Sequence, residues 1–488
     1  MPKILASQII ISLCFLAVIV LIFTDKLNRA VAAITAAVIT YFVLTFIEKK
    51  NFSVIVDLLF GTPDDGFVNL HSLILILGMM FIVQISDEVG LFQFLGVLAI
   101  KLSKGKPIAL MTILCIISVF FSAIINNILT VMILIPLTIT ISRILKIDPT
   151  PYIITEAIMV NIGGTFFSIS SIPNILIVTE TNIKFNEFFV NVGLFSILTA
   201  GITITFFIFL YRKEFRDPGR KLIETLDEFN VWNFVQSRRL LYASMSSLGI
   251  LFIGFILIGP VIPSDKVPID IFAMSVAMLL TIFSAFLGLK PKEIIKRFDL
   301  ELILYLLGIF VLAGGLEAVG IVALIGNLLK GLGANNPVFQ LILVIWVSAF
   351  LSSMIDNIPI TKILIPVVGI MSPSNDYYYA LSFGANWGDN LTPLGDNILV
   401  LNIAEQNNRP IKMKTFWKIG FSTTILQLFI VSIYFTMLSR GTYLIGLILI
   451  LAVFATIGIL FIFSKYGSEQ IKSNINRGIN KFRSLIIS

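Results

Sequence analysis

The chain has 488 residues, of which 57% are hydrophobic and only 13% charged, whereas soluble proteins carry about a quarter charged residues. Several apolar runs exceed the roughly 18 residues that a membrane-spanning helix requires. The net charge of +7 comes largely from basic residues in short loops between these runs, which is typical of membrane orientation signals and not of nucleic-acid binding. Together these features exclude a soluble globular protein and predict an all-α polytopic membrane protein.

The sequence offers little for catalysis or for a resident metal centre. Cys14 and Cys115 both lie in apolar runs, and His71 is the single histidine, so no zinc-ligand spacing is present. No P-loop and no nucleophile–base pair at membrane depth is apparent. We therefore expect a protein that is not an enzyme and that needs no cofactor beyond a coupling ion. The sequence leaves room for a separate ATPase subunit.

Taken in chain order, the apolar runs predict about eleven membrane crossings. Residues 1–67 hold N-terminal transmembrane helices, and residues 68–211 form a first repeat. Residues 212–239 are the one long polar segment, which we interpret as a cytoplasmic linker. Residues 240–438 form a second repeat, and residues 439–488 hold a last crossing and a basic tail.

Both repeats contain the same polar interruption of an apolar run. It reads FSAIINNILTVMILIP in the first repeat and FLSSMIDNIPITKILIP in the second, which places Asn127 and Asn357 230 positions apart. An apolar run with a polar centre predicts a re-entrant hairpin, here at residues 107–141 and 337–371. The same offset of 230 relates Ser122 to Ser352, Pro136 to Pro366, and Leu77-Gly78 to Leu307-Gly308.

Each repeat also contains one crossing that is interrupted at its centre, at residues 152–178 and 379–403. Basic residues flank the first hairpin but hardly the second, so the first is predicted to enter from the cytoplasm and the second from outside. The two repeats are therefore expected to be inverted, with the N-terminus outside and the C-terminus inside.

The hairpin tips and helix breaks are the candidate binding sites, because helix N-termini at such breaks favour anions and carbonyl ends favour cations. Asparagine and threonine oxygens suit Na⁺, which we expect at the hairpin tips, at Asn127 and Asn357. Glycine at a break lets the backbone approach a ligand closely. The candidate residues are Asn126, Asn127, Thr130, Asn161, Gly163, Gly164, Thr165, Asn174, Asp356, Asn357, Thr361, Lys362, Gly388, Asp389, Asn390, Thr392, Asp396 and Asn397.

For any one of these amides, the structural alternative is a helix cap or a link between helices. Duplication of the whole set in register favours a transport pathway instead. Lys362 lies six positions after Asp356. Its functional interpretation is a tethered cation that replaces a bound Na⁺ or attracts an anion. Its structural interpretation is a partner of Asp356 or a snorkelling surface lysine.

Four phrases resemble signature segments of the ion transporter superfamily, and especially those of arsenite permeases and the melanosomal P protein. They are IINNILTVMILIP, NIGGTFFSISSIPN, SSMIDNIPITKILIP and FGANWGDNLTPLGDNILVLNIAEQ. Dicarboxylate/sodium symporters and NhaD-type antiporters are more distant relatives. The resemblance spans about residues 68–414 and implies a two-repeat transporter, often a homodimer, with an elevator-like motion. The chain departs from the family pattern at Asp389, Asp396-Asn397 and Lys362, which weighs against arsenite as the substrate.

We therefore expect a secondary active transporter of a small ion or anion, either an oxyanion such as arsenite or a carboxylate such as citrate, coupled to H⁺ or Na⁺. A Na⁺/H⁺ antiporter is the alternative within this class, favoured by the carboxylates of the second repeat. An ion channel is the alternative from a different class. The expected location is the cell membrane, with the lipid bilayer, the substrate and a second copy of the chain as partners, and no nucleic acid.

Overall fold

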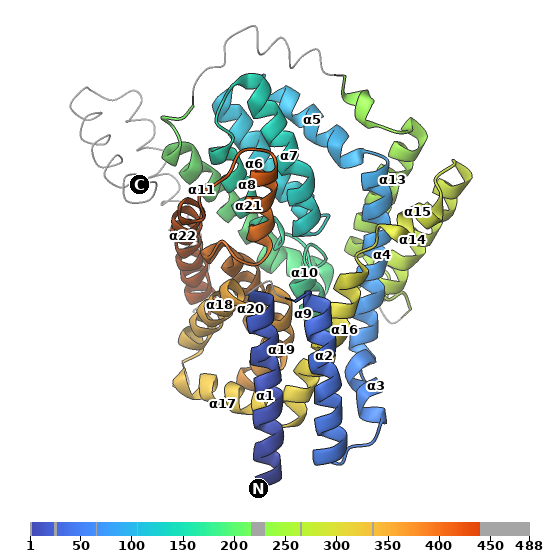
Figure 1. Ribbon diagram of the computed structural model, residues 1–488, viewed down its shortest axis with the longest axis vertical. Helices are drawn as coiled ribbons and strands as arrows, with labels where there is room; N and C mark the ends of the chain where they lie inside the picture. The colour runs from blue at the N-terminus through green and yellow to red at the C-terminus, as the bar shows by residue number, and fades with distance from the viewer. Residues whose placement is uncertain are drawn as a thin grey trace, which may run out of the picture. The chain divides into compact units, whose positions relative to one another are not determined.

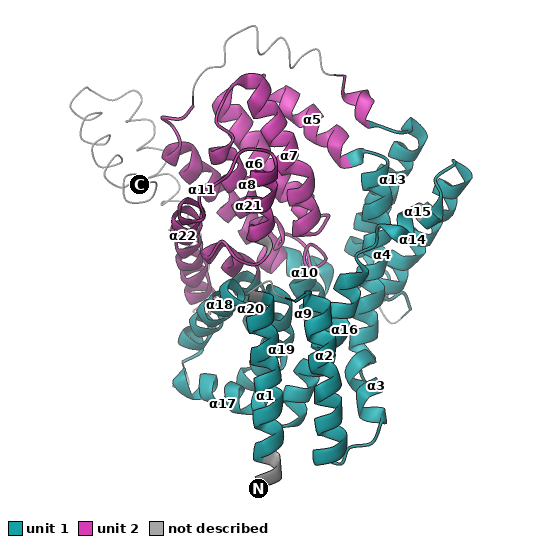
Figure 2. Ribbon diagram, in the orientation of Figure 1, with its two compact units in different colours: residues 1–91, 172–189, 235–385 teal, residues 92–171, 190–234, 386–488 magenta. Residues whose placement is uncertain are grey.

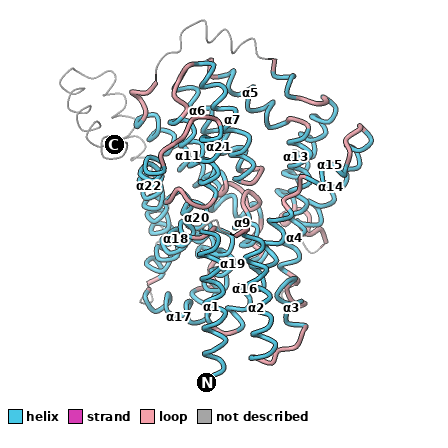
Figure 3. The backbone as a smooth tube through the Cα atoms, in the orientation of Figure 1, coloured by secondary structure: helices cyan, strands magenta, loops and turns pink. Residues whose placement is uncertain are grey.

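The computed structural model describes residues 2–23, 27–64, 66–104, 106–215, 230–263, 266–333 and 336–439. These residues are helical apart from turns and loops, and within them the one β-type contact is an isolated bridge between Ile258 and Ile262 (Figure 3). Ten helical segments of the described chain are long and apolar enough to cross a membrane. The predicted all-α polytopic class is therefore confirmed. The last predicted crossing, the basic tail and linker residues 216–229 lie outside the described residues.

The chain divides into two compact units, each of which draws on both sequence repeats (Figure 2). Unit 1 comprises residues 1–91, 172–189 and 235–385, and unit 2 comprises residues 92–171, 190–234 and 386–488. These units are not the sequence repeats, whose predicted boundaries at residues 68–211 and 240–438 stay a prediction.

Unit 1 holds one hairpin and most of the long helices (Figure 2). Its helices are α1 (Pro2–Phe23), α2 (Arg29–Phe42), η1 (Val43–Ile47), α3 (Ser53–Phe60), α4 (Val68–Glu88), α9 (Ile172–Thr181), α10 (Phe185–Phe188), α13 (Arg238–Leu257), α14 (Ile269–Phe286), α15 (Pro291–Lys296), α16 (Leu300–Ala318), α17 (Ile321–Leu332), α18 (Pro337–Met354), α19 (Asn357–Met371) and α20 (Asn375–Gly388), the last of which continues into unit 2.

Unit 2 holds the other hairpin. Its helices are α5 (Leu91–Leu102), α6 (Pro107–Ser122), α7 (Asn127–Leu145), α8 (Thr150–Gly163), η2 (Phe189–Gly193), α11 (Leu194–Leu210), η3 (Val231–Phe234), η4 (Asp389–Leu391), α21 (Asp396–Gln406) and α22 (Met413–Ser439). In the described part of the linker, Trp232 of η3 packs against Phe94 of α5 with ring centroids 5.0 Å apart.

The two hairpins form where the sequence predicts them. Helices α6 and α18 each begin with a proline, which suits the first helical position because its missing N–H would have no helical partner. The returning helices α7 and α19 begin at Asn127 and Asn357, each capped by the side chain of the preceding residue. A second proline lies inside each returning arm, at Pro136 and Pro366.

Both predicted broken crossings are divided into two short helices. The first becomes α8 and α9, and the second becomes α20 and α21 with the short η4 turn between them. The halves are exchanged between the units: α9 packs against α19 of the other repeat, and α21 packs against α7. Each unit therefore combines a hairpin of one repeat with a half-helix of the other.

Two glycines that repeat at the offset of 230 explain the closest helix packing in unit 1. A Cβ added at Gly78 of α4 would lie 3.0 Å from the backbone nitrogen of Met274 in α14, and one at Gly308 of α16 would lie 2.6 Å from the carbonyl carbon of Ala33 in α2. Small residues at such contacts let transmembrane helix backbones approach closely. Helix α14 accordingly runs beside α4, and α2 runs beside α16 (Figure 1).

Large apolar side chains lie on the outside of the long helices. Phe286 is 85% exposed and Leu279 68% exposed, both on α14, and Phe46 in η1 is 72% exposed. Side chains of this kind on crossings of sufficient length are expected to face lipid hydrocarbon. The chain is an integral multi-pass membrane protein.

Candidate functional site

The structure separates the predicted binding residues into two sets, one in each unit. Unit 1 holds Asn174, Asp356, Asn357, Thr361 and Lys362. Unit 2 holds Asn126, Asn127, Thr130, Asn161, Gly163, Gly164, Thr165, Gly388, Asp389, Asn390, Thr392, Asp396 and Asn397. Asp396 begins α21, and its side chain is outside the described atoms.

The first hairpin tip is organised by its two adjacent asparagines. Asn126 caps α7, because its Oδ1 accepts from the backbone N–H of Leu129 at 2.8 Å, and its backbone oxygen accepts from Thr130 Oγ1 at 3.1 Å. Asn127 turns inward and is 6% exposed. Its Oδ1 lies 2.8 Å from Ser122 Oγ, which is also 2.6 Å from the carbonyl oxygen of Val160 in α8. Asn126 is thus a cap, while Asn127 belongs to the interior of unit 2.

Three buried asparagines form a directional chain of hydrogen bonds. Asn127 Nδ2 donates to Asn161 Oδ1 at 2.8 Å, and Asn161 Nδ2 donates to Asn390 Oδ1 at 2.7 Å. Asn390 Nδ2 donates in turn to the carbonyl oxygen of Ile158 at 3.2 Å. We call Asn127, Asn161 and Asn390 the amide chain. It joins the first hairpin tip to both helix breaks that lie in unit 2.

Oxygen atoms of this region converge beside Gly164, at the end of α8. A Cβ at Gly164 would lie 3.3 Å from Asn127 Oδ1, 3.3 Å from Asn386 Oδ1 and 3.4 Å from the backbone oxygen of Asn161. Neutral amide and carbonyl oxygens are ligands that suit a small hard cation. A side chain at Gly164 would fill this space, which explains the glycine. Gly163 is required for packing instead, since its Cβ would lie 2.5 Å from the carbonyl oxygen of Val119 in α6.

The remaining candidates of unit 2 hold the broken helices in place. Trp387 Nε1 donates to Thr165 Oγ1 at 3.1 Å, and Thr165 Oγ1 is 2.8 Å from Ser196 Oγ. Asn397 Nδ2 donates to the backbone oxygen of Asp389 at 2.8 Å, which closes the loop between η4 and α21. Asp389 is 5% exposed, so this loop carries a buried carboxylate. Gly388 lies in the last turn of α20 and Thr392 directly follows η4.

The second hairpin tip has a different chemistry. Asp356 caps α19 by accepting from the backbone N–H of Ile358 at 3.3 Å, and its Oδ2 accepts from Tyr305 OH at 3.1 Å. Asn357 is buried at the first position of α19, and Thr361 donates to its backbone oxygen at 2.6 Å. Asn174 of α9 accepts from Ser382 of α20 at 2.7 Å.

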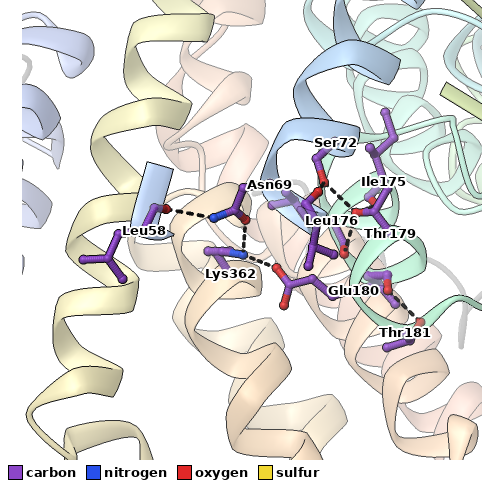
Figure 4. A network of polar contacts seen from close by, with 11 residues as sticks. Leu58, Asn69, Ser72, Ile175, Leu176, Thr179, Glu180, Thr181 and Lys362 are labelled. Carbon is purple, nitrogen blue, oxygen red and sulfur yellow. Dashed lines mark hydrogen bonds and ion pairs between the residues drawn. The ribbon is translucent and has the colours of Figure 1, made fainter. Parts of the chain in front are cut away.

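Lys362 of α19 forms an ion pair with Glu180 of α9 (Figure 4). The prediction that Lys362 pairs with Asp356 is wrong, because Asp356 Oδ2 accepts from Tyr305 OH and Lys362 pairs with Glu180. The surface-lysine alternative is also wrong, since only 12% of the Lys362 side chain and 15% of the Glu180 side chain are exposed. Lys362 Nζ donates to Asn69 Oδ1 at 2.7 Å as well.

Sequence reasoning missed several residues that complete these two sets, among them Asn386, whose Oδ1 lies beside Gly164, and Ser196, the partner of Thr165. Ser122 carried a signal, since its register with Ser352 was visible, but neither serine was placed in the site. Glu180 lies two residues beyond the predicted end of the first broken crossing, whereas α9 continues to Thr181. Asn69 and Trp387 carried no local signal, because their roles depend on helices distant in sequence.

Within the described parts of the chain, no group of three or more His, Cys, Asp or Glu side chains could hold a metal ion. The expectation that the chain holds no zinc site rests on its sequence alone. His71 pairs with Asp270, their Nδ1 and Oδ2 lying 2.8 Å apart, which gives it a structural partner.

Comparisons with known proteins agree with this architecture. The "46 kDa membrane protein" of Mycobacterium leprae is 26% identical over 430 residues, which cover 86% of this chain and 96% of that protein. The human P protein is 25% identical over 504 residues, which cover 86% of this chain and 59% of that protein. The crystal structure of the YdaH transporter of Alcanivorax borkumensis has a similar fold, with a TM-score of 0.56 and 16% identity over 80% of this chain and 88% of that chain.

The resemblance to the ion transporter superfamily, including the P protein, is confirmed by these relatives. The family model described as citrate transporter, CitMHS, matches residues 19–380, which is well over half of the chain. The chain is therefore a membrane transporter that belongs to the CitMHS citrate transporter family.

Proposed function

We propose that this protein is a secondary active transporter of a small carboxylate or oxyanion, with a citrate-type carboxylate as the leading substrate class, coupled to Na⁺ or H⁺. The observation that supports this proposal is the buried amide chain of Asn127, Asn161 and Asn390 at a hairpin tip and two helix breaks. Polar groups at such breaks are where transporters of duplicated design bind their ligands.

The chemistry of unit 2 supports an anion together with a cation. Helices α7 and α21 both begin at breaks, and helix N-termini offer unpaired N–H groups and a positive dipole to anionic groups. The three oxygens beside Gly164, from Asn127, Asn386 and Asn161, would hold a Na⁺ and supply positive charge for the substrate. Thr165 and Trp387 would keep these oxygens in position.

A Na⁺/H⁺ antiporter is the second candidate, favoured by the buried carboxylate of Asp389 next to the amide chain. A carboxylate at membrane depth suits a cation or a proton better than an anion. The elevator-like motion, a homodimer and a cell-membrane location with a cytoplasmic C-terminus follow from the family resemblance and belong to the same proposal.

The test is uptake into proteoliposomes that contain the purified full chain. Citrate, succinate, phosphate, arsenite and Na⁺ would be offered separately, each with an imposed Na⁺ or pH gradient. We expect saturable uptake of a carboxylate that needs one of the gradients and falls at least tenfold in Asn127→Ala. The matched control is Asn402→Ala, because Asn402 is an exposed asparagine on α21.

The alternatives give different outcomes in the same vesicles. A Na⁺/H⁺ antiporter would acidify or alkalinise the lumen in response to Na⁺ without any organic anion. Rapid conductance that follows voltage and does not saturate would overturn the transporter proposal in favour of a channel.

A further inference from the structure

The side chains that contact the ammonium group of Lys362 are all of kinds that bind cations. Glu180 provides a carboxylate and Asn69 an amide oxygen at 2.7 Å. The ring of Phe310 lies beneath, with Nζ 5.0 Å from its centroid, in the geometry of a cation–π contact. A carboxylate, an amide oxygen and an aromatic face thus surround one ammonium.

These groups are positioned by contacts of their own. Asn69 Nδ2 donates to the backbone oxygen of Leu58 at 2.8 Å, so its Oδ1 is directed toward Lys362 (Figure 4). Ser72 Oγ of α4 lies 2.6 Å from Thr179 Oγ1 of α9, next to Glu180. The helices that carry the amide and the carboxylate are therefore linked without the lysine. The cage around the ammonium is preorganised.

The fold itself does not require this ion pair. In the first repeat, the position equivalent to Lys362 is Met132, at the offset of 230. Asn174 and Asn397 are equivalent at an offset of 223, and the same offset makes Ile403 the equivalent of Glu180. Helices α7 and α21, which carry Met132 and Ile403, pack against each other as α19 and α9 do. The same helix pairing is thus made with two apolar residues in unit 2 and with two charged residues in unit 1.

We propose that unit 1 contains a monovalent-cation site, formed by Glu180, Asn69 and Phe310, in which the Lys362 ammonium is the resident ion. The ligand class is an alkali cation, Na⁺ or K⁺, which takes the place of Nζ when the lysine is removed. A divalent metal is disfavoured because, among the described residues, a single carboxylate, that of Glu180, contacts the ammonium. This site is separate from the amide chain, and the inference goes beyond the proposed function by assigning unit 1 a built-in cation.

The test compares thermal unfolding of the purified full chain in NaCl, KCl and choline chloride at equal ionic strength. Lys362→Met keeps the aliphatic stem and leaves the place of Nζ open. We expect this variant to melt lower than wild type in choline and to regain about 5 °C in NaCl or KCl, in a saturable manner, because a ligand that binds only the folded state stabilises it. The double variant Lys362→Met/Glu180→Gln should lose that response.

Two further comparisons make the result decisive. Lys330→Met, which removes an exposed lysine of α17 in the same unit, should respond to the salts as wild type does. If NaCl or KCl stabilises wild type and Lys362→Met equally, the cation binds at the amide chain and not at this site. Failure of the Lys362 inference therefore leaves the proposed function untouched. A folded Lys362→Met that responds no more than wild type would overturn the inference. So would a variant that fails to fold in all three salts, since no free cation then replaces the ammonium.

Discussion

Ser122 and Ser352, 230 positions apart, make the same hydrogen bond in different units. Ser122 Oγ lies 2.6 Å from the carbonyl oxygen of Val160, and Ser352 Oγ lies 2.6 Å from the carbonyl oxygen of Ala385. In each case the serine lies in the last turn of the first arm of a hairpin, and the carbonyl lies near the end of the helix that precedes a break. Both hairpins are therefore fixed to their neighbouring helix by the same buried contact.

We expect Ser122→Ala and Ser352→Ala to destabilise the protein by similar amounts, about 1–2 kcal/mol each, because each leaves a buried carbonyl without that partner. Thermal unfolding in detergent would measure the loss. Ser275→Ala is a suitable control, since Ser275 is exposed on α14 and bonds only to its own helix. A loss confined to one of the two serines would contradict the equivalence of the hairpins.

The amide chain makes a sharper prediction, because its hydrogen bonds all run in one direction. In Asn161→Asp, the new carboxylate still accepts from Asn127, but it meets Asn390 Oδ1 where the amide had donated at 2.7 Å. Asn390 cannot simply turn over, since its Nδ2 is needed by the carbonyl oxygen of Ile158. We expect at least a tenfold loss of substrate uptake and a loss of about 2 kcal/mol in stability.

The measurement is uptake in proteoliposomes alongside thermal unfolding, with Asn402→Asp on the exposed face of α21 as the control. If Asn161→Asp transported like wild type, the amide chain would be a structural link and not part of the transport site.

The repeated polar motifs predicted the hairpins because a polar interruption in an apolar run is a local signal. Asn127 and Asn357 begin α7 and α19, as the register between the repeats requires. The exchange of half-helices between units was not predictable, because the sequence does not say that α9 packs with the hairpin of the other repeat. Glu180 was missed for the same reason, since its partner Lys362 lies 182 positions away. A carboxylate at the end of an apolar run is otherwise typical of the membrane interface.

The close contact at Gly308 gives a prediction about packing. A methyl group at this position would lie 2.6 Å from the carbonyl carbon of Ala33 and 2.8 Å from the backbone nitrogen of Ile34, which are backbone atoms of α2 and not the end of a flexible side chain. We expect Gly308→Ala to destabilise the protein by about 1–3 kcal/mol, as overpacking does elsewhere. The control is Gly249→Ala in α13, where a Cβ would meet no atom within 4 Å. That substitution should be neutral or stabilising, because alanine has the higher helix propensity. Equal effects at the two glycines in thermal unfolding would refute the packing argument.

The ion pair of unit 1 leads to a double-mutant cycle. Glu180→Gln removes the carboxylate and leaves the Lys362 ammonium, which is only 12% exposed, without its main counter-charge. A buried charge without its partner costs about 3–5 kcal/mol. Lys362→Met/Glu180→Gln removes both charges, so we expect it to be more stable than Glu180→Gln alone, with a coupling free energy of about 2 kcal/mol or more. The cycle would be measured by chemical or thermal unfolding in choline chloride, where no alkali cation replaces the ammonium. If the losses in unfolding free energy of the two single variants add up to that of the double variant, the pair contributes little, as an exposed salt bridge does. That result would also weaken the assignment of Lys362 as a resident cation.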